Sequence, residues 1–471
     1  MRIFKRFAGG RLLLLGLFAL LALGGCAALF FTAPHMLPPL LFAERTLAIA
    51  AAVRVCAQDA LPESRLARLT LAVALPFFGS ALCFFFRPIR GEAQTSDLPV
   101  SASRFARLAG SPENRAERAD YFPTGEAWRA PFLSDLAAAQ REILLEYYIV
   151  AEGVLWSEIF RILRRKAAEG VQVRLLFDAF GCALALPSRF VRDMARAGIC
   201  AKPFRKLSLR ADAARRDHRK LAVIDGAVAY VGGINLADEY VGEEIRFGHW
   251  KDSALRLTGS VVCDFRHMFL RTWGAKNRPL APENICVPAQ SGHTMPAIAV
   301  SDDADGRIPR AGARVLHELC GQAKETLWLC TPYLAPDAAT MRALMRAAAG
   351  GTDVRIAVPH IPDKKAVYLL TKRCARILEK GGVKVRSYLP GFLHAKSAVC
   401  DGRYVFVGSY NLDCRSLYAQ AECGALIQSR ELAEALGRDF CEIWAQSAPI
   451  PPARLPERVL AAVLLPFYAL I

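Results

Sequence analysis

Two copies of the pattern His-x-Lys-x4-Asp carry the side chains of this sequence that are best suited to chemistry. The copies consist of His218, Lys220 and Asp225 and of His394, Lys396 and Asp401. One imidazole can attack a phosphorus atom while the other protonates the leaving oxygen. The two lysine ammonium groups can hold negative oxygens as charge builds in the transition state. The doubled pattern therefore predicts chemistry on a phosphodiester.

The stretch that follows each copy is also repeated. At the same distance comes a turn of small residues and an asparagine, in the runs Gly-Gly-Ile-Asn ending at Asn235 and Gly-Ser-Tyr-Asn ending at Asn411. Amide and hydroxyl groups are suitable ligands for phosphoryl oxygens. We therefore predict that Asn235, Ser409 and Asn411 bind the substrate phosphate.

The two aspartates of the pattern have two possible roles. Asp225 and Asp401 belong to the repeated motif, so we count them with the catalytic group. Each is followed by glycine, and Asp-Gly is a strong signal for the tip of a β-hairpin. The alternative is that they are turn residues that set the register of the strands.

The elements around the motifs also read as a duplication. Each half is expected to contain strand, helix, strand and helix before its histidine: 139–149, 156–169, 170–178 and 190–197, then 324–333, 341–349, 351–359 and 366–380. Alternating strands and helices indicate an α/β sandwich with a mixed sheet in each half. We place each His and Lys on a strand, where residues i and i+2 share a face.

Length and charge narrow the class of protein. A chain of 471 residues allows two or three domains. We expect a membrane-anchoring region and linker at 1–110, two α/β domains at 111–285 and 286–455, and an apolar tail at 456–471. The net charge of +17 implies anionic partners, either nucleic acid or an acidic lipid surface. The 14 cysteines form no CxxC pairs, so we predict neither a metal site nor a cofactor.

Two apolar runs near the N-terminus favour lipid. Leu12–Phe31 is long enough to cross a bilayer, and Leu69–Phe86 is a second, shorter candidate. Basic residues before the first run and after the second favour a hairpin with both ends in the cytoplasm. The alternative for the first run is a cleaved signal, with lipoprotein processing at Cys26. The tail Val459–Ile471 is too short to span, and either lies in the membrane interface or forms a last core helix.

The motifs resemble those of the phospholipase D superfamily and, within it, bacterial cardiolipin synthases. Beside the doubled pattern, the likeness rests on the runs His249–Asp252 and Gly408–Leu417 and on the paired apolar segments at the N-terminus. One departure is Gly233, which stands where the superfamily usually has serine. The resemblance implies two tandem phospholipase D-like α/β sandwich domains, related by pseudo-twofold symmetry, with both histidines at their interface.

The resemblance also implies that an acidic residue orients each imidazole. Glu422 lies eleven residues after Asn411, where the family places such a carboxylate. At the corresponding place in the first half stands Arg246, so Asp252, after an apparent insertion, is the better candidate. Arg415 could contact a lipid phosphate or form a structural salt bridge.

The activity implied is that of a cardiolipin synthase in a bacterial inner membrane, with the catalytic domains in the cytoplasm. A phosphatidyl group would pass from one phosphatidylglycerol to another through a phosphatidyl-histidine, with release of glycerol. The alternatives are a phospholipase D hydrolase, a transferase that uses phosphatidylethanolamine as donor, and a nuclease of the same superfamily. Nucleic acid is disfavoured as a partner because the sequence has no evident aromatic stacking platform. The sequence gives neither the nucleophilic histidine nor the oligomeric state.

Overall fold

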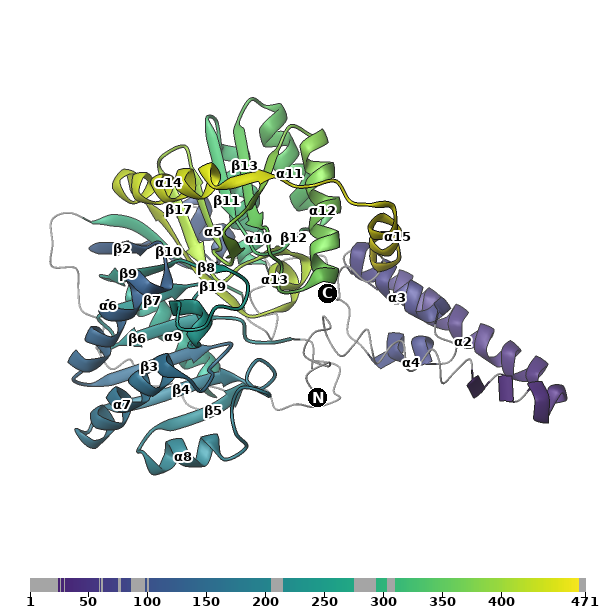
Figure 1. Cartoon of the computed structure of the whole chain (residues 1–471), viewed down its shortest axis with the longest axis horizontal. Helices are drawn as coiled ribbons and strands as arrows, with labels where there is room; N and C mark the ends of the chain where they lie inside the picture. The colour runs from purple at the N-terminus through teal and green to yellow at the C-terminus, as the bar shows by residue number, and fades with distance from the viewer. Residues whose placement is uncertain are drawn as a thin grey trace.

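The structure is a computed structural model of the chain. It describes residues 101–204, 215–274, 294–302 and 310–465, and, nearer the N-terminus, 24–25, 27–28, 30–58, 60, 62–74, 78–85 and 98–99. Two β-sheets form the body, and a group of N-terminal helices extends away from it (Figure 1).

The first sheet contains the first histidine motif. Its described strands run in the order β2 (Arg118–Phe122), β9 (Ala254–Thr258), β7 (Val228–Gly232), β6 (Lys220–Ile224), β3 (Glu142–Tyr147), β4 (Gln172–Asp178) and β5 (Cys200–Phe204). β3 is parallel to β4 and antiparallel to β6. The sheet is therefore mixed, as the sequence predicts. β3 and β6 are buried along their whole length, which explains their nearly continuous apolar runs.

The second sheet repeats this order. Its central strands are β10 (Met295–Asp302), β19 (Glu422–Gln428), β17 (Tyr404–Gly408), β16 (Ser397–Cys400), β11 (Thr326–Cys330), β13 (Asp353–Pro359) and β14 (Lys384–Tyr388). Two edge strands are added, β1 (Asn114–Ala116) beside β10 and β20 (Ser447–Pro449) beside β14. Each of the seven central strands has a counterpart in the first sheet. The predicted duplication is thus present in the strand order itself.

The two sheets share an apolar core. Leu144, Leu221 and Val231 of the first sheet belong to the same buried cluster as Val399 and Val407 of the second. Two helices that follow corresponding strands complete this cluster, α9 (Val261–Gly274) after β9 and α14 (Arg430–Ala445) after β19. Burial of this layer fixes one half against the other, because apolar surface removed from water favours the closed arrangement.

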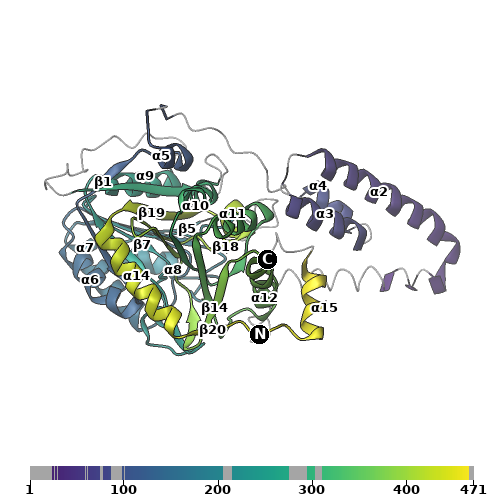
Figure 2. The same ribbon diagram turned by 90° about the horizontal axis from the view of Figure 1, so that it is seen from above.

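Helices cover the outer faces of both sheets (Figure 2). On the first sheet these are α6 (Gly125–Ala138), α7 (Val154–Ala168) and α8 (Phe190–Arg196). On the second they are α5 (Arg104–Ala109), α10 (Ala311–Gln322), α11 (Ala338–Ala349) and α12 (Lys365–Lys380). The predicted helices at 156–169, 190–197, 341–349 and 366–380 are confirmed. Residues 104–109 lie in the expected linker and 114–116 in the expected first domain, but α5 and β1 (Asn114–Ala116) both pack on the second half.

The predicted Asp-Gly hairpins are confirmed, whereas the predicted strand position of the motifs is only partly right. β6 and β7 pair antiparallel around Asp225 and Gly226, whose φ angles are 54° and 64°. Positive φ at both central residues is the requirement of a type I′ turn. His218 precedes β6, and His394 and Lys396 precede β16. The backbone N–H groups of His218 and His394 donate across the two halves, to the carbonyls of Ala421 and Lys251.

The N-terminal helices do not confirm the predicted membrane spans. Within the described part of the chain, every helix falls short of the length and apolar character needed to cross a bilayer. The run 12–31 lies mostly outside the described residues. The run 69–86 is divided between α3 (Pro62–Ala74) and α4 (Phe78–Phe85), with 75–77 outside them. The sequence did not predict α2 (Leu37–Ala57), which packs against both.

The described part of the C-terminal tail contains a helix. α15 (Leu455–Leu464) packs beside α12, where Lys372 pairs with Glu457 at 3.1 Å. Leu464 is buried, while Leu455, Val459 and Val463 are exposed. The helix therefore has one face on the body and one apolar face in the open, which combines features of the two alternatives predicted for the tail.

Candidate active site

Short backbone pairings between the halves bring the two histidine motifs together. β8 (His249–Lys251) pairs in parallel with β15 (Gly391–Leu393), and the N–H of His394 then donates to the carbonyl of Lys251 at 2.7 Å. In the other half-site the N–H of His218 donates to the carbonyl of Ala421 at 2.8 Å. In each case the next residue in the partner segment is acidic. The pairing thus sets a carboxylate beside the imidazole of the opposite half.

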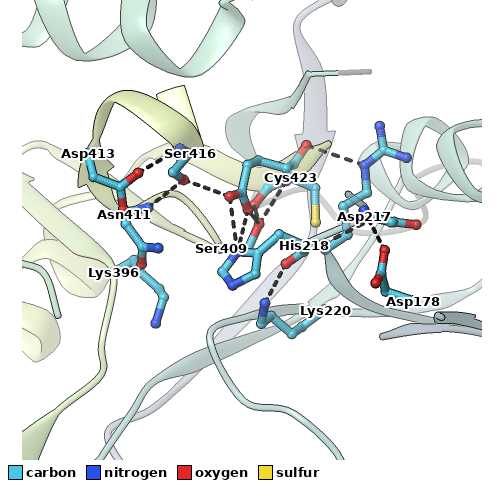
Figure 3. A network of polar contacts seen from close by, with 12 residues as sticks. Asp178, Asp217, His218, Lys220, Lys396, Ser409, Asn411, Asp413, Ser416 and Cys423 are labelled. Atoms are coloured by element: carbon cyan, nitrogen blue, oxygen red, sulfur yellow. Dashed lines mark hydrogen bonds and ion pairs between the residues drawn. The ribbon is translucent and has the colours of Figure 1, made fainter. Parts of the chain in front are cut away.

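The first half-site combines His218 with Glu422. Nδ1 of His218 lies 3.0 Å from both carboxylate oxygens of Glu422. The same carboxylate accepts hydrogen bonds from the hydroxyls of Ser409 and Ser416. Figure 3 shows these two serines converging from the second half on the ring of His218 from the first. Glu422 is fully buried, so these hydrogen bonds replace its lost hydration.

The second half-site combines His394 with Asp252. Nδ1 of His394 lies 2.5 Å from a carboxylate oxygen of Asp252, which is also fully buried. The other oxygen accepts from the backbone N–H of Ser253 at 2.8 Å. Aromatic rings surround this imidazole, with the centroids of Tyr240 and Trp250 at 5.3 and 5.4 Å. Tyr240 holds the sequence position of Ser416, but its hydroxyl bonds to Asn235 and not to the carboxylate.

Asp252 and Glu422 are structural counterparts, as the predicted insertion requires. The N–H of Gly233 donates to the carbonyl after Asp252, and the N–H of Ser409 donates to the carbonyl after Glu422. Arg246 lies in the inserted segment and pairs with surface carboxylates. A Cβ on Gly233 would stand 2.1 Å from Oδ1 of Asp252. Glycine is therefore required there because the short aspartate draws its carboxylate into the space that a serine would occupy.

The motif lysines lie beside their own histidines. Both ammonium groups are buried, and each donates to the backbone carbonyl of the histidine two residues earlier, Lys220 to His218 and Lys396 to His394. Nζ of Lys396 also lies 2.8 Å from Nδ1 of His394. The structure thus collects two cations and two imidazoles at the junction of the halves.

The three predicted phosphate ligands differ in how many of their polar side-chain atoms already have hydrogen-bond partners. The Asn235 amide donates to the Tyr240 hydroxyl at 2.7 Å and accepts from the N–H of Ile149 at 3.0 Å. The Ser409 hydroxyl is bound to Glu422. Oδ1 of Asn411, in contrast, is buried and has no hydrogen-bond partner among the described residues. Among the three, Asn411 is the one whose side chain retains bonding capacity for a ligand.

The structure does not bring Asp225 and Asp401 to the histidines. Each lies at the hairpin tip, at the far end of β6 or β16. The Asp225 carboxylate accepts from three successive backbone N–H groups, those of residues 140, 141 and 142. The Asp401 carboxylate does the same with residues 324, 325 and 326. Counting them as catalytic is corrected to the turn alternative, because these bonds tie each hairpin to the start of the neighbouring strand.

Burial shifts the pKa values of the two carboxylates, the two lysines and the two histidines at the junction. It raises the pKa of Asp252 and of Glu422 to about 7. It lowers the pKa of Lys220 to about 8 and of Lys396 to about 7. Both histidines have a pKa well below the ordinary value, because burial and then the nearby lysines disfavour the imidazolium. Such displaced values are typical of sites that move protons.

A pocket opens beside His218. It encloses about 560 Å³, part of it open to solvent, and its lining includes Tyr148, Lys364, Asn411 and Arg415. The sequence did not point to Lys364 or to the aromatic rings around His394. It did hold a signal for Ser416 and Tyr240, because each lies five residues after its asparagine. Within the described residues, no group of three or more His, Cys, Asp or Glu side chains is arranged to hold a metal ion.

Comparisons with known proteins give the family of the chain. The family described as "Cardiolipin synthase, PLD-like domain" matches residues 132–246 and 316–444. A cardiolipin synthase of Geobacillus thermodenitrificans is 33% identical over 362 residues, which are 75% of this chain and 71% of that protein. An uncharacterized protein of Streptococcus mutans is 34% identical over 397 residues, 83% of this chain and 85% of that one.

A solved structure extends the likeness to the fold. The crystal structure of phosphatidylserine synthase from Haemophilus influenzae aligns with a TM-score of 0.60 and 17% identity, over 77% of this chain and 96% of that one. Fold and sequence define an enzyme of the phospholipase D superfamily that transfers phosphatidyl groups. Within that superfamily, the chain belongs to the cardiolipin synthase family of phospholipase D-like proteins.

Proposed function

We propose that the enzyme is a cardiolipin synthase that joins two molecules of phosphatidylglycerol and releases glycerol. The observation that carries this proposal is the pair of imidazoles at the junction of the halves, each held at Nδ1 by a carboxylate from the opposite half. An imidazole whose Nδ1–H is held presents its other nitrogen to substrate in a fixed direction. Two such imidazoles can serve as nucleophile and as acid and base at one phosphorus.

The reaction has two displacements. One imidazole attacks phosphorus, a phosphorus–nitrogen bond forms, and the bond to the glycerol oxygen breaks as the other imidazole gives it a proton. The hydroxyl of a second phosphatidylglycerol then attacks the same phosphorus. Its proton passes to the imidazole that acted as acid, and the phosphorus–nitrogen bond breaks. Lys220, Lys396 and Asn411 hold the phosphoryl oxygens in both steps.

The substrate itself sets the required protonation. Before substrate binds, burial and then the two lysines lower the pKa of both histidines, so both imidazoles are neutral at pH 7. A bound phosphodiester brings a negative charge that offsets these cations, and one imidazole can then take up the proton that the leaving group needs. The nucleophile must stay neutral, so the two half-sites must differ in their affinity for a proton.

We propose that the side bearing α15 and α2 faces the lipid bilayer. Leu455, Val459 and Val463 expose apolar side chains on α15, and Phe42 and Val53 do so on α2. Exposed apolar side chains grouped on helices are suited to the apolar edge of the headgroup layer. A lipid alcohol is concentrated there, which favours transfer over hydrolysis.

The test is the product spectrum of the purified full chain in mixed micelles. Phosphatidylglycerol labelled in both the acyl chain and the headgroup is supplied with and without phosphatidylethanolamine, and with and without a chelator. We expect cardiolipin and one free glycerol per turnover without phosphatidylethanolamine, undiminished by the chelator because lysine and asparagine hold the charge. Phosphatidic acid as the sole product would show a hydrolase. Cardiolipin formed only when phosphatidylethanolamine is present, with release of ethanolamine, would show that phosphatidylethanolamine is the donor.

A further inference from the structure

Two cations in the pocket beside His218 have no part in the two displacements. Lys364, at the N-cap of α12, and Arg415, on α13 (Cys414–Ala419), both line this pocket. The ammonium group of Lys364 stands 4.6 Å from the ring centroid of Tyr333, which also lines it. Both cations lower the pKa of His218 through their charge. They therefore lie close enough to the reacting centre to act on the same substrates.

Neither cation forms a close ion pair with a carboxylate of the described residues. Within the described residues, neither Lys364 nor Arg415 has a carboxylate oxygen within 4.0 Å of its charged nitrogens. The acidic residue that lines the pocket, Asp413, accepts instead from the backbone N–H of Ser416. The Gln420 amide satisfies both of its polar atoms when its oxygen faces Arg415. In that orientation the Nε–H of Arg415 donates to this oxygen at 3.2 Å. The guanidinium thus keeps donors for a ligand, and the two cations outnumber Asp413, the one carboxylate of the lining, which interacts with both through its charge.

The same pocket offers a buried acceptor. Asn411 lines it and is 4% exposed, and no described residue offers a hydrogen-bond partner to its Oδ1. A buried polar atom left unpaired is costly, so the site gains when a ligand supplies a donor. A ligand that matches all three groups carries an anion for the two cations and a hydroxyl for the amide oxygen.

We propose that Lys364 and Arg415 bind the non-reacting phosphate of the acceptor lipid, and that Asn411 receives a hydroxyl of its glycerol. This inference rests on the proposed function. The acceptor phosphatidylglycerol keeps its own phosphodiester anion, and three carbons and two oxygens separate it from the phosphorus that its terminal hydroxyl attacks. Anchoring that anion turns the attack of a mobile alcohol into the attack of a positioned one. It also gives the lipid alcohol an advantage over water, which carries no anion.

Lys364 and Arg415 should therefore affect the rate of transfer only when the acceptor carries a phosphate. Two reactions of the full-length protein separate the cases: cardiolipin formation from phosphatidylglycerol, and exchange of labelled free glycerol into phosphatidylglycerol. Both need the same phosphatidyl-enzyme, but glycerol has no phosphate. We expect Lys364→Gln and Arg415→Gln each to lower the ratio of cardiolipin formation to glycerol exchange about tenfold, because charge-assisted hydrogen bonds are the strong ones.

Matched variants guard against a general loss of structure. Lys365→Gln removes the neighbouring charge, which is exposed outside the pocket lining, and should keep the wild-type ratio. Lys364→Arg keeps the charge and should restore most of the ratio. A parallel fall of both reactions would overturn the inference, because the cations would then serve the reacting phosphate. An unchanged ratio would overturn it as well. A wild-type chain that exchanges glycerol but makes no cardiolipin would reject the proposed function together with this inference.

Discussion

Asp252 and Glu422 occupy equivalent positions in the two halves, yet their surroundings differ. Glu422 reaches His218 with a longer side chain and accepts from two serine hydroxyls. Asp252 reaches His394 with a shorter one and accepts from a single backbone N–H. The burial that raises both pKa values to about 7 is thus opposed by more hydrogen bonds at Glu422 than at Asp252.

The surroundings of the two imidazoles also differ, because those of His218 are more polar than those of His394. The His218 side opens into the polar pocket with its extra cations. The His394 side is packed by Tyr240, Trp250 and Phe392. A duplicated fold has therefore been specialised by substitutions around a conserved geometry. A reaction that needs one neutral and one protonated imidazole is served by such inequality, because identical half-sites would share the proton equally.

The largest effects are expected from removing either imidazole. His218→Ala and His394→Ala should each lower cardiolipin formation about a thousandfold or more, since each removes a group that reacts with substrate. Acyl-labelled phosphatidylglycerol, followed by denaturation at alkaline pH, which spares phosphohistidine, shows whether lipid stays on the protein. If the half-sites differ in role, one variant alone accumulates the adduct. Equal labelling of both variants would show that the halves are interchangeable.

A second pair of variants exchanges the residues that lie beside the two carboxylates. Gly233→Ser places its Cβ against Asp252 and should displace the carboxylate from His394, lowering turnover about a hundredfold by misorienting the imidazole. The reciprocal change, Ser409→Gly, removes one of two hydroxyls from Glu422 and should cost much less. Turnover numbers are compared with thermal unfolding midpoints, so that folding losses are recognised. Similar losses in both variants would contradict the difference between the half-sites.

Local features of the sequence predicted much of this arrangement. The Asp-Gly dipeptides specify type I′ hairpins through backbone preferences that act over four residues. Pairings between distant segments were beyond the same reasoning, because β8 meets β15 across about 140 residues and no local pattern encodes that contact. Asp225 and Asp401 were assigned by motif membership, although their Asp-Gly context pointed to the turn. Lys364 could not be found at all, since it belongs to no repeated motif.

The pH dependence of kcat/KM should distinguish the two motif lysines. As pH falls through about 7, Asp252 and Glu422 gain protons and no longer accept from the imidazoles, so kcat/KM should fall on the acid side. As pH rises, Lys396 loses its charge at about 7 and Lys220 at about 8. The result is a narrow bell-shaped profile whose two limbs overlap.

Lys396→Arg keeps a charge at high pH and should move the alkaline limb upward, to the pKa of Lys220. A limb unmoved in Lys396→Arg would exclude Lys396 as its cause.

The smallest expected effect concerns the support of Glu422. The Ser416 hydroxyl stabilises the ionised carboxylate and so lowers its pKa. Ser416→Ala removes this bond, and we expect the acid limb of kcat/KM to move to higher pH with an activity loss of about fivefold at neutral pH. Tyr240→Phe is the matched control, because Tyr240 holds the same sequence position in the other half but bonds to Asn235 rather than to a carboxylate. Its acid limb should stay in place. A shift in both variants would mean that the acid limb does not belong to Glu422, and that the different surroundings of the two carboxylates have no bearing on proton transfer.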